Sequence, residues 1–159
     1  MIRVGQGYDV HPFAAGQRLV LGGVEIACSR GGLAGHSDAD VLAHAIASAL
    51  LGSLALGDLG THFPDGDPRW QDAVSLDLLR DVCGRIRDRG YAVVNCDATL
   101  VAQEPRLAPY VPQMRAHLAA ALGVDVDRVS VKATTHEKLG ALGRAEGIAC
   151  HAVVLVADE

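Results

Sequence analysis

The chain has 159 residues, half of them apolar and 21% charged, so it is long enough for one domain with a buried core and too apolar for global disorder. Its formal net charge is −5 and it contains no basic tract, which argues against nucleic acid as a partner. No apolar run reaches the roughly 18–20 residues of a membrane-spanning helix, and residues 1–30 lack a signal-peptide pattern, so we expect no membrane partner and a cytoplasmic location.

Alternating apolar residues and glycine turns predict that the chain begins with strands. The predicted strands of this region are residues 2–12, 18–21 and 24–28. Pro12 is expected to end the first strand, because proline cannot donate to a strand ladder. Gly22 and Gly23 separate the other two and favour a hairpin turn between them.

A glycine-rich loop over residues 30–35 precedes the first predicted helix. Ser37 is expected to cap the N-terminus of this helix, which extends to about Leu54. Residues 57–72 are rich in Gly, Pro and Asp and have no periodicity, so they predict a long loop. A loop of this length is unusual in a compact domain and is often functional.

The second half of the chain alternates between predicted helices and strands. An apolar stripe at helical spacing predicts a helix over residues 73–89, ended by Gly90. The remaining predicted elements are a strand over 91–102, a rigid proline turn over 103–112, a helix over 113–122, a strand over 128–133, a glycine loop over 140–147 and a last strand over 148–157. This order predicts a single α+β domain over residues 1–159, with a mixed β-sheet and helices on one of its faces.

Asp9 and His11 form the strongest local signal for a metal site. Residues i and i+2 of a strand point to the same face, so this carboxylate and this imidazole would project together. His44 is the best third ligand, since it lies among apolar neighbours, where an unpaired imidazole is costly. Three protein ligands with one open position are typical of catalytic zinc sites. A D-x-H pair is nevertheless common without metal, and His44 alone also fits a hydrogen-bonded, partly buried side chain.

The cysteines offer no alternative metal site. None of them lies in the C-x-x-C pair that cysteine zinc sites usually contain. They are expected to be reduced, buried small hydrophobes. Their positions are Cys28, Cys83, Cys96 and Cys150.

Two further segments favour phosphate binding. His36, Ser37 and Asp38 lie at a predicted helix N-terminus, where free amides attract anions, although an ordinary N-cap is the better explanation for Ser37 alone. Residues 132–138 follow a predicted strand and offer two hydroxyls, a carboxylate and flanking lysines, which suit phosphates around a hard cation such as Mg²⁺. The alternative for this second segment is a polar strand end.

Asp58, Asp65 and Asp67 crowd the predicted long loop with no counter-charge nearby. They suit polyol hydroxyls or a cation, and a role in turn formation is about equally compatible with the local sequence. Arg144 and Glu146 lie in the glycine loop, where a surface ion pair is the simplest interpretation.

Common catalytic motifs are missing from the sequence. Gly5-Gln6-Gly7 lacks the third glycine and the following helix of a dinucleotide-binding fingerprint. There is also no G-x-x-x-x-G-K-[ST] motif and no nucleophile elbow for Ser-His-Asp chemistry. The residues alone therefore identify no protein nucleophile.

Seven motifs occur in the order in which one known family carries them, and they cover essentially the whole chain. They are Gly7-Tyr8-Asp9-Val10-His11, His36-Ser37-Asp38-Ala39-Asp40, Gly57-Asp58-Leu59-Gly60, Phe63-Pro64-Asp65, Pro112-Gln113-Met114-Arg115, Lys132-Ala133-Thr134-Thr135-x-Glu137-Lys138-Leu139-Gly140 and Gly143-Arg144-x-Glu146-Gly147. The chain resembles the 2-C-methyl-D-erythritol 2,4-cyclodiphosphate synthases. The resemblance implies a lyase of the non-mevalonate isoprenoid pathway, which closes 4-diphosphocytidyl-2-C-methyl-D-erythritol 2-phosphate to the cyclic diphosphate and releases CMP.

The resemblance also implies two metal ions. Zn²⁺ would be held by the three residues proposed above, and Glu137 would help to bind Mg²⁺ or Mn²⁺ between the substrate phosphates. His36 and Thr135 would stabilise the transition state by hydrogen bonding.

The substrate-binding residues implied by the resemblance come from three parts of the chain. They are Ser37, Asp58, Leu59, Gly60, Phe63, Asp65, Asp67, Ala102, Pro105, Arg106, Leu107, Ala108, Lys132, Thr134 and Arg144. Those from 58 to 65 would hold the methylerythritol part, and residues 102–108 with Thr134 would frame the cytosine and its phosphate.

Members of this family are homotrimers with active sites between subunits, which agrees with the high apolar fraction. Arg144 would meet a phosphate or, with Glu146, line the trimer axis, where an isoprenoid diphosphate can bind. Ala141 stands where a bulky aromatic residue is common in the family, so the contacts around that axis are expected to differ. Gln6 and Tyr8 are smaller departures, and His136 at the variable motif position is expected to be solvent-exposed.

Two other functions remain open at this point. One is a zinc phosphohydrolase that uses bound water as the nucleophile, and the other is a non-catalytic trimer that binds isoprenoid diphosphates. Both leave the ordered motifs unexplained, and the reaction product distinguishes all three.

Overall fold

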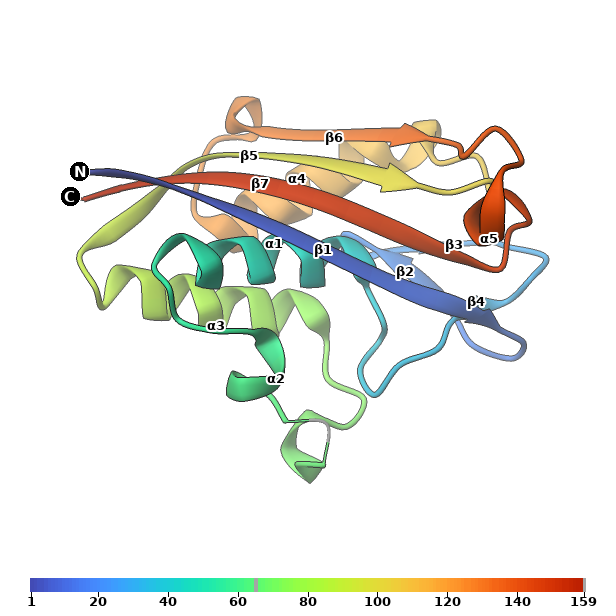
Figure 1. Ribbon diagram of the computed structural model, residues 1–159, viewed down its shortest axis with the longest axis horizontal. Helices are drawn as coiled ribbons and strands as arrows, with labels where there is room; N and C mark the ends of the chain where they lie inside the picture. Colours follow the sequence, from blue (N-terminus) through green and yellow to red (C-terminus); the bar gives the residue numbers. More distant parts are fainter. Residues whose placement is uncertain (65, 159) are drawn as a thin grey trace.

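A mixed β-sheet forms one layer of the molecule, and its main helices cover one face (Figure 1). The computed structural model describes residues 1–64 and 66–158. The strands are β1 (Ile2–Ala14), β2 (Leu19–Leu21), β3 (Val24–Ile26), β4 (Gly32–Leu33), β5 (Tyr91–Val101), β6 (Val129–Thr134) and β7 (Gly147–Asp158). The α-helices are α1 (Val41–Ser53), α2 (Leu59–His62), α3 (Ser75–Arg87), α4 (Val111–Leu122) and α5 (Gly140–Gly143), with 3₁₀ turns at Pro68–Trp70, Ala108–Tyr110 and Val126–Arg128.

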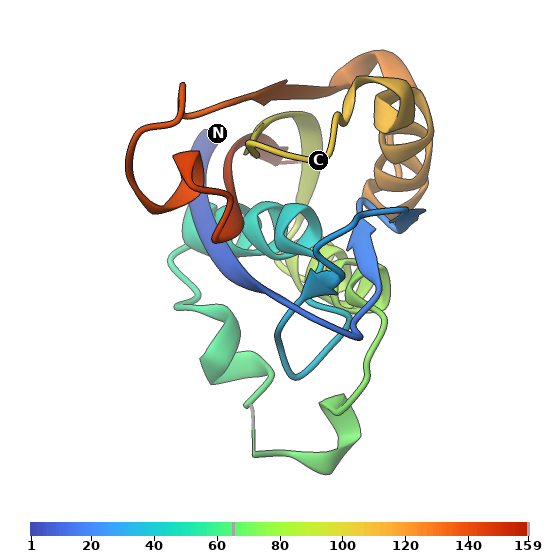
Figure 2. The ribbon, with the colours of Figure 1, turned by 90° about the vertical axis from the view of Figure 1, so that its right-hand side faces the viewer.

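The strand order of the sheet is β4-β1-β7-β5-β6, and β2 pairs with β3 in a separate hairpin. Only β5 and β6 run parallel; the other pairs of the five-stranded sheet are antiparallel. Helix α1 packs against β1 and β7, and α3 lies behind it, as Figure 2 shows from the side. The α+β class with a mixed sheet is therefore confirmed.

The first strand and the fourth helix begin or end differently from the prediction. Pro12 does not end β1, because it stands at the last pair of the β1–β7 ladder, where a missing N–H costs little. The strand continues through Phe13, whose amide donates to the Glu146 carbonyl at 2.9 Å. Helix α4 begins at Val111, two residues early, because Pro112 fits the first turn of a helix.

The cap of α1 is Asp40, so the prediction that Ser37 caps this helix is wrong. The Asp40 carboxylate is fully buried and accepts a hydrogen bond from the Ala43 amide at 3.1 Å. It also accepts from the amides of Gly22 and Gly23, at 2.9 and 2.8 Å. Burial raises the pKa of the Asp40 carboxyl, whereas these three amides oppose the shift. One side chain thus ties the β2–β3 turn to the start of α1.

The predicted long loop contains two short helical segments, each capped by an aspartate. Asp58 accepts from the amide and the hydroxyl of Thr61, both at 2.8 Å, at the start of α2. Asp67 caps the Pro68–Trp70 turn and forms an ion pair with Arg69, so the expectation of no counter-charge nearby is wrong for this residue. The predicted glycine loop likewise includes the one-turn helix α5.

Close contact between β1 and α1 depends on two glycines. A Cβ atom built on Gly7 would lie 1.9 Å from the Ala45 carbonyl oxygen, and one on Gly5 would lie 1.8 Å from that of Ala49. Helix α1 is apolar on nearly all sides and is buried accordingly. The backbones of β1 and α1 are therefore in close contact, because the strand residues at these two positions have no side chain.

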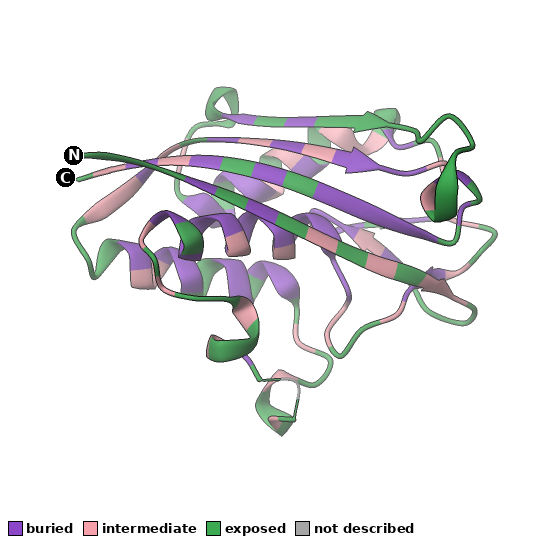
Figure 3. Ribbon diagram, viewed as in Figure 1, coloured by how far each residue is buried: buried purple, intermediate pink, exposed green. Residues whose placement is uncertain are grey.

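The opposite face of the sheet is exposed (Figure 3). Its apolar side chains include Val4, Tyr8 and Val10 of β1, with exposed fractions of 63%, 49% and 46%. Val153 of the neighbouring β7 is 46% exposed. Several large apolar side chains thus share one uncovered surface.

The two ends of the chain lie side by side. Ile2 pairs with Ala157 at the start of the β1–β7 ladder, and the Met1 ammonium forms an ion pair with Asp158. In Figure 1 both termini emerge at the same end of the sheet.

The buried cysteines agree with their predicted role as small hydrophobes, whereas Cys28 is only half-buried. Burial raises the pKa of the Cys83 thiol to about 11 and that of Cys96 to about 12. None of the helices in the described part of the chain is long and apolar enough to cross a membrane.

Candidate metal centre and substrate pockets

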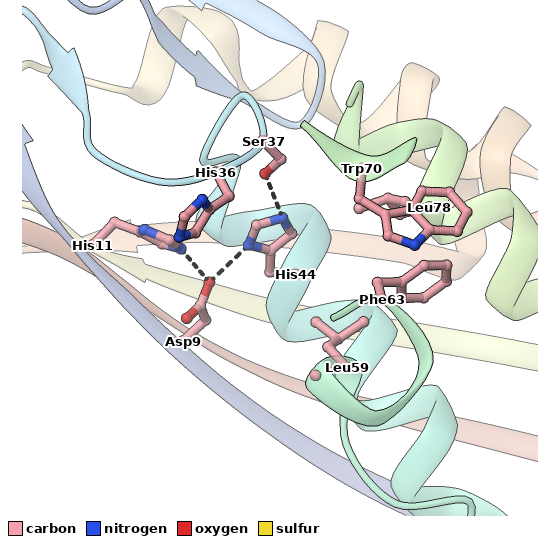
Figure 4. A pocket seen from close by; sticks show the side chains of 10 residues that line it. Asp9, His11, His36, Ser37, His44, Leu59, Phe63, Trp70 and Leu78 are labelled. Carbon is pink, nitrogen blue, oxygen red and sulfur yellow. Dashed lines mark hydrogen bonds and ion pairs between the residues drawn. The ribbon is translucent and has the colours of Figure 1, made fainter. Parts of the chain in front are cut away.

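One face of β1 and the first turns of α1 build the candidate metal centre. Gly5, Gly7, Asp9 and His11 alternate along the strand, so they share the face toward α1. The glycines bring the helix close, and the next two residues extend toward His44 (Figure 4). The close packing of strand and helix thus places the three side chains together.

The distances within this group are short. Asp9 Oδ2 lies 3.0 Å from His11 Nε2 and 3.1 Å from His44 Nδ1. One ligand atom from each residue lies within 4.8 Å of the others, and no other group of this kind occurs within residues 1–64 and 66–158. The predicted convergence of these three residues is confirmed.

Hydrogen bonding orients His11 within the group. Its Nδ1 lies 2.6 Å from the Ala34 carbonyl oxygen, which can only accept, so Nδ1 carries a hydrogen, and Nε2 faces Asp9. Burial opposes the charged form of Asp9, but its hydrogen bonds with His11 and His44 outweigh burial and hold its pKa well below the usual range. Burial lowers the pKa of His11, and the interactions with Asp9 more than reverse this, so that pKa is raised.

This donor set fits a divalent transition-metal ion. Two imidazole nitrogens and one carboxylate oxygen are ligands that zinc accepts, and three such ligands leave a position open for substrate. The three side chains are only 14–26% exposed, so the paired charges are partly shielded from water. The arrangement can hold a cation and present it to one side.

That side is a cavity of about 230 Å³, which we call the His–Asp pocket. It is lined by Asp9, His11, His36, Ser37, His44, Leu59, Gly60, Phe63, Trp70 and Leu78 (Figure 4). Trp70 and Leu78 were not predicted. Leu78 belongs to the apolar stripe that predicts the helix over residues 73–89. Trp70 packs edge-on against Phe63, with ring centroids 4.9 Å apart. The one sequence feature that could have pointed to Trp70 is that it is an aromatic residue within a largely polar loop.

Two of the predicted loop aspartates, Asp58 and Asp67, are not among the lining residues. Asp58 and Asp67 serve as helix caps, and their pKa values are lowered, chiefly by hydrogen bonds from Thr61 and Arg69 respectively. Asp65, predicted to bind substrate, lies outside the described residues.

A second cavity, of about 270 Å³, lies elsewhere on the chain; we call it the 102–108 pocket. It is lined by Ala102, Gln103, Pro105, Arg106, Leu107, Ala108, Ala133, Thr134 and Thr135. The structure therefore brings the predicted cytosine-binding segment together with the end of β6. Among the described residues, the two pockets share no lining side chain.

Thr135 and Glu137 occupy a tight turn after β6. The Glu137 amide donates to Thr135 Oγ1 at 3.1 Å, and both Glu137 and Lys138 have positive φ, at 50° and 63°. Such backbone is unfavourable for residues with a Cβ and often marks a functional turn. Glu137 and the neighbouring His136 are exposed, the latter as predicted, and Glu137 is not part of the Asp9 group.

Two predicted substrate-binding residues pair with neighbouring acids. Lys132 forms an ion pair with Asp97, and Arg144 Nε lies 2.6 Å from Glu146 Oε1. The surface ion pair considered for Arg144 is therefore present. Neither basic residue lines the two pockets described above.

Comparison with known proteins extends these observations. A 2-C-methyl-D-erythritol 2,4-cyclodiphosphate synthase of Moorella thermoacetica is 60% identical over 157 residues, which cover 99% of this chain and 96% of that protein. The solved structure of a Plasmodium falciparum IspF in complex with CDP is 34% identical, with a TM-score of 0.85 and coverage of 99% and 97%. The bifunctional IspDF of Campylobacter jejuni superimposes with a TM-score of 0.95 at 40% identity, and the chain spans 43% of that longer protein. The sequence profile of the YgbB family matches residues 2–157, and the chain belongs to this family.

Proposed function

We propose that the protein converts 4-diphosphocytidyl-2-C-methyl-D-erythritol 2-phosphate to 2-C-methyl-D-erythritol 2,4-cyclodiphosphate, with release of CMP, in the non-mevalonate pathway. Membership of the YgbB family and relatives named as this synthase over nearly their full length support the proposal. The convergence of Asp9, His11 and His44 is the structural observation that carries it. The active protein would be a single synthase domain over residues 1–159, working in the cytoplasm.

Asp9, His11 and His44 would hold Zn²⁺, with the imidazoles and carboxylate aimed from β1 and α1 into the His–Asp pocket. A zinc ion supplies Lewis-acid polarisation of a phosphoryl oxygen. Because the attacking 2-phosphate belongs to the substrate, the chain needs no nucleophile of its own. This explains why sequence analysis identified none.

His36 and Thr135 would stabilise charge in the transition state by hydrogen bonding, and Glu137 would help to hold Mg²⁺ or Mn²⁺ on the substrate phosphates. His36 lines the His–Asp pocket, whereas Thr135 lines the 102–108 pocket. Their separate locations agree with a substrate that has a polyol end and a nucleotide end.

The substrate would extend between the two pockets. Leu59, Gly60 and Phe63 would contact the methylerythritol part, together with Ser37 and the loop aspartates Asp58, Asp65 and Asp67. The nucleotide end would meet the second set, which is Ala102, Pro105, Arg106, Leu107, Ala108, Lys132 and Thr134. A pocket lined mostly by apolar residues with a few polar groups suits recognition of a base by shape and a few hydrogen bonds.

A homotrimer would complete the site between subunits. The exposed apolar face of β1 and β7 is a surface that a monomer rarely leaves uncovered. The two pockets of one chain share no described lining residue, and a neighbouring copy would supply the pocket that faces the metal centre. Arg144 and Glu146 would then lie toward the trimer axis, where an isoprenoid diphosphate could bind despite the small side chain of Ala141.

The direct test of the reaction measures CMP release from the cytidylated substrate, with and without a metal chelator. We expect stoichiometric CMP and cyclic diphosphate, and loss of most activity after chelation that returns on addition of Zn²⁺ and Mg²⁺. Inorganic phosphate as the product would instead indicate a phosphohydrolase. Binding of isoprenoid diphosphates without any CMP release would indicate a non-catalytic trimer.

Mixing two inactive variants tests whether the site is shared. His11→Ala removes a metal ligand, and Thr135→Ala removes a hydroxyl from the other pocket. If each site uses both pockets from different copies, a randomly reassembled 1:1 mixture should regain about a quarter of wild-type activity, because one site in four combines two intact halves. If each site lies within one chain, the mixture stays as inactive as its separately reassembled components.

A further inference from the structure

The ring of His44 has a second nitrogen, and this nitrogen contacts Ser75, a residue that none of the predicted roles includes. His44 directs Nδ1 toward Asp9, so Nε2 lies on the far side of the imidazole. Ser75 Oγ lies 2.8 Å from Nε2, and Ser37 Oγ lies 3.2 Å away. Ser75 is the first residue of α3 and is only 1% exposed. A buried hydroxyl so close to a ligand imidazole is positioned to orient it.

The hydroxyl of Ser75 is itself held by a carboxylate. Its Oγ makes a short hydrogen bond with Asp38 Oδ1, and the Ser75 amide donates to Asp38 Oδ2 at 3.1 Å. Asp38 is fixed in turn, because Oδ1 accepts from the Asp40 amide at 3.2 Å and the Asp38 amide donates to the Ala73 carbonyl at 3.1 Å. Both carboxylate oxygens of Asp38 thus accept hydrogen bonds, which fix the orientation of the side chain.

Donor and acceptor chemistry gives this chain of contacts a direction. A carboxylate can only accept, so the Ser75 hydroxyl donates its hydrogen to Asp38. The serine oxygen then accepts from His44, so Nε2 carries a hydrogen. Without a metal ion Nδ1 bonds to Asp9, and when an ion is bound the Nδ1 lone pair would face that ion. Histidines that bind metals commonly donate their other N–H to a carboxylate or carbonyl, and His11 does so with Ala34 at 2.6 Å. For His44, the Ser75 hydroxyl links Nε2 of the ring to the Asp38 carboxylate.

We propose that Ser75 and Asp38 are positioning residues for the metal centre: they form a hydrogen-bond relay that holds His44 with Nδ1 toward the ion. The relay joins the N-terminus of α3 to the ligand on α1, although 31 residues separate Ser75 from His44. Ser37 is a weaker partner, because its contact is longer and its oxygen also accepts from the Ala39 amide. The inference rests on the proposed metal site and adds to it the groups that orient one ligand.

A Ser75→Ala variant tests the relay, because it deletes the hydroxyl and keeps the backbone amide that bonds Asp38. Zn²⁺ affinity is measured by competition with a chromophoric chelator, and thermal unfolding is measured on the metal-free proteins. We expect affinity to fall about 10- to 100-fold, as for other groups that orient a metal ligand. Ser75→Thr, which restores a hydroxyl, should recover affinity to near the wild-type value. With Co²⁺ in place of zinc, the visible absorption bands should shift in Ser75→Ala and return in Ser75→Thr.

Ser53→Ala is the matched control. Ser53 is also a buried serine, but its hydroxyl donates to the Leu50 carbonyl at 2.7 Å on α1. This variant should keep wild-type metal affinity. The relay is refuted if Ser75→Ala binds zinc as tightly as wild type, if Ser53→Ala loses as much affinity, or if Ser75→Thr stays as weak as Ser75→Ala. A wild-type protein that binds no zinc would instead refute the metal site itself, and the relay with it.

Discussion

His44→Ala is expected to abolish tight zinc binding and to lower the rate of CMP release by at least about 10³-fold, roughly 4 kcal/mol of transition-state stabilisation. The physical reason is that His44 supplies one of the three ligand atoms of the group formed by Asp9, His11 and His44. The fold should persist, since alanine suits an apolar, buried helix such as α1. Metal content after dialysis, CMP release and circular dichroism give the three readouts.

His117→Ala provides the control for loss of a histidine. His117 Nδ1 lies 3.1 Å from the Gly22 carbonyl oxygen and is not among the residues lining the His–Asp pocket. This variant should retain its zinc and its rate within a small factor. Full activity of zinc-free His44→Ala would contradict the proposed role of the metal centre.

Gly7→Ala is the second substitution with a large expected effect. The added Cβ would lie 1.9 Å from the Ala45 carbonyl oxygen, so the backbone of β1 or α1 must move. Overpacking of this kind typically costs 1–3 kcal/mol, and a backbone clash places Gly7→Ala at about 3 kcal/mol or beyond. Because His44 lies one residue before Ala45, displacement of α1 should also weaken zinc binding. Urea unfolding and chelator competition measure the two effects.

The matched control for Gly7 is Gly84, a glycine within α3 with open space around it. Alanine there should stabilise the protein by up to about 1 kcal/mol, because glycine is a poor residue inside a helix. If the two substitutions change the free energy of unfolding with opposite signs, the effect of close packing is separated from that of helix propensity. A Gly7→Ala protein as stable as wild type would show that strand and helix do not meet as described.

Local sequence reasoning predicted that the three candidate metal ligands converge, although it left open whether they bind a metal ion. Asp9 and His11 share a strand face, and His44 was placed by the cost of an unpaired imidazole among apolar neighbours; the structure confirms their convergence. The mixed sheet and the long helices were predicted for the same reason, since apolar spacing is a local property. The short helices α2 and α5 escaped prediction because one turn carries no measurable periodicity.

Two other long-range hydrogen-bonding arrangements could not be predicted from the sequence. Asp40, rather than Ser37, caps α1 because its carboxylate also binds the amides of a distant turn, at Gly22 and Gly23. Ser75 gave no signal, since its partners His44 and Asp38 are 31 and 37 residues away. A polar residue that acts through tertiary contacts cannot be distinguished in the sequence from any other polar residue.

The paired chain ends have a consequence for how this domain can be joined to others. Strand β1 rises about 23 Å between Ile2 and Asp9, so both termini emerge well away from the metal centre. A tether attached at either end would therefore leave the His–Asp pocket accessible, and adjacent termini make fusion and circular permutation tolerable. The bifunctional Campylobacter jejuni protein, in which a domain of this shape is part of a longer chain, fits such an arrangement. Two catalysts could be carried on one polypeptide without either obstructing the entrance of the other.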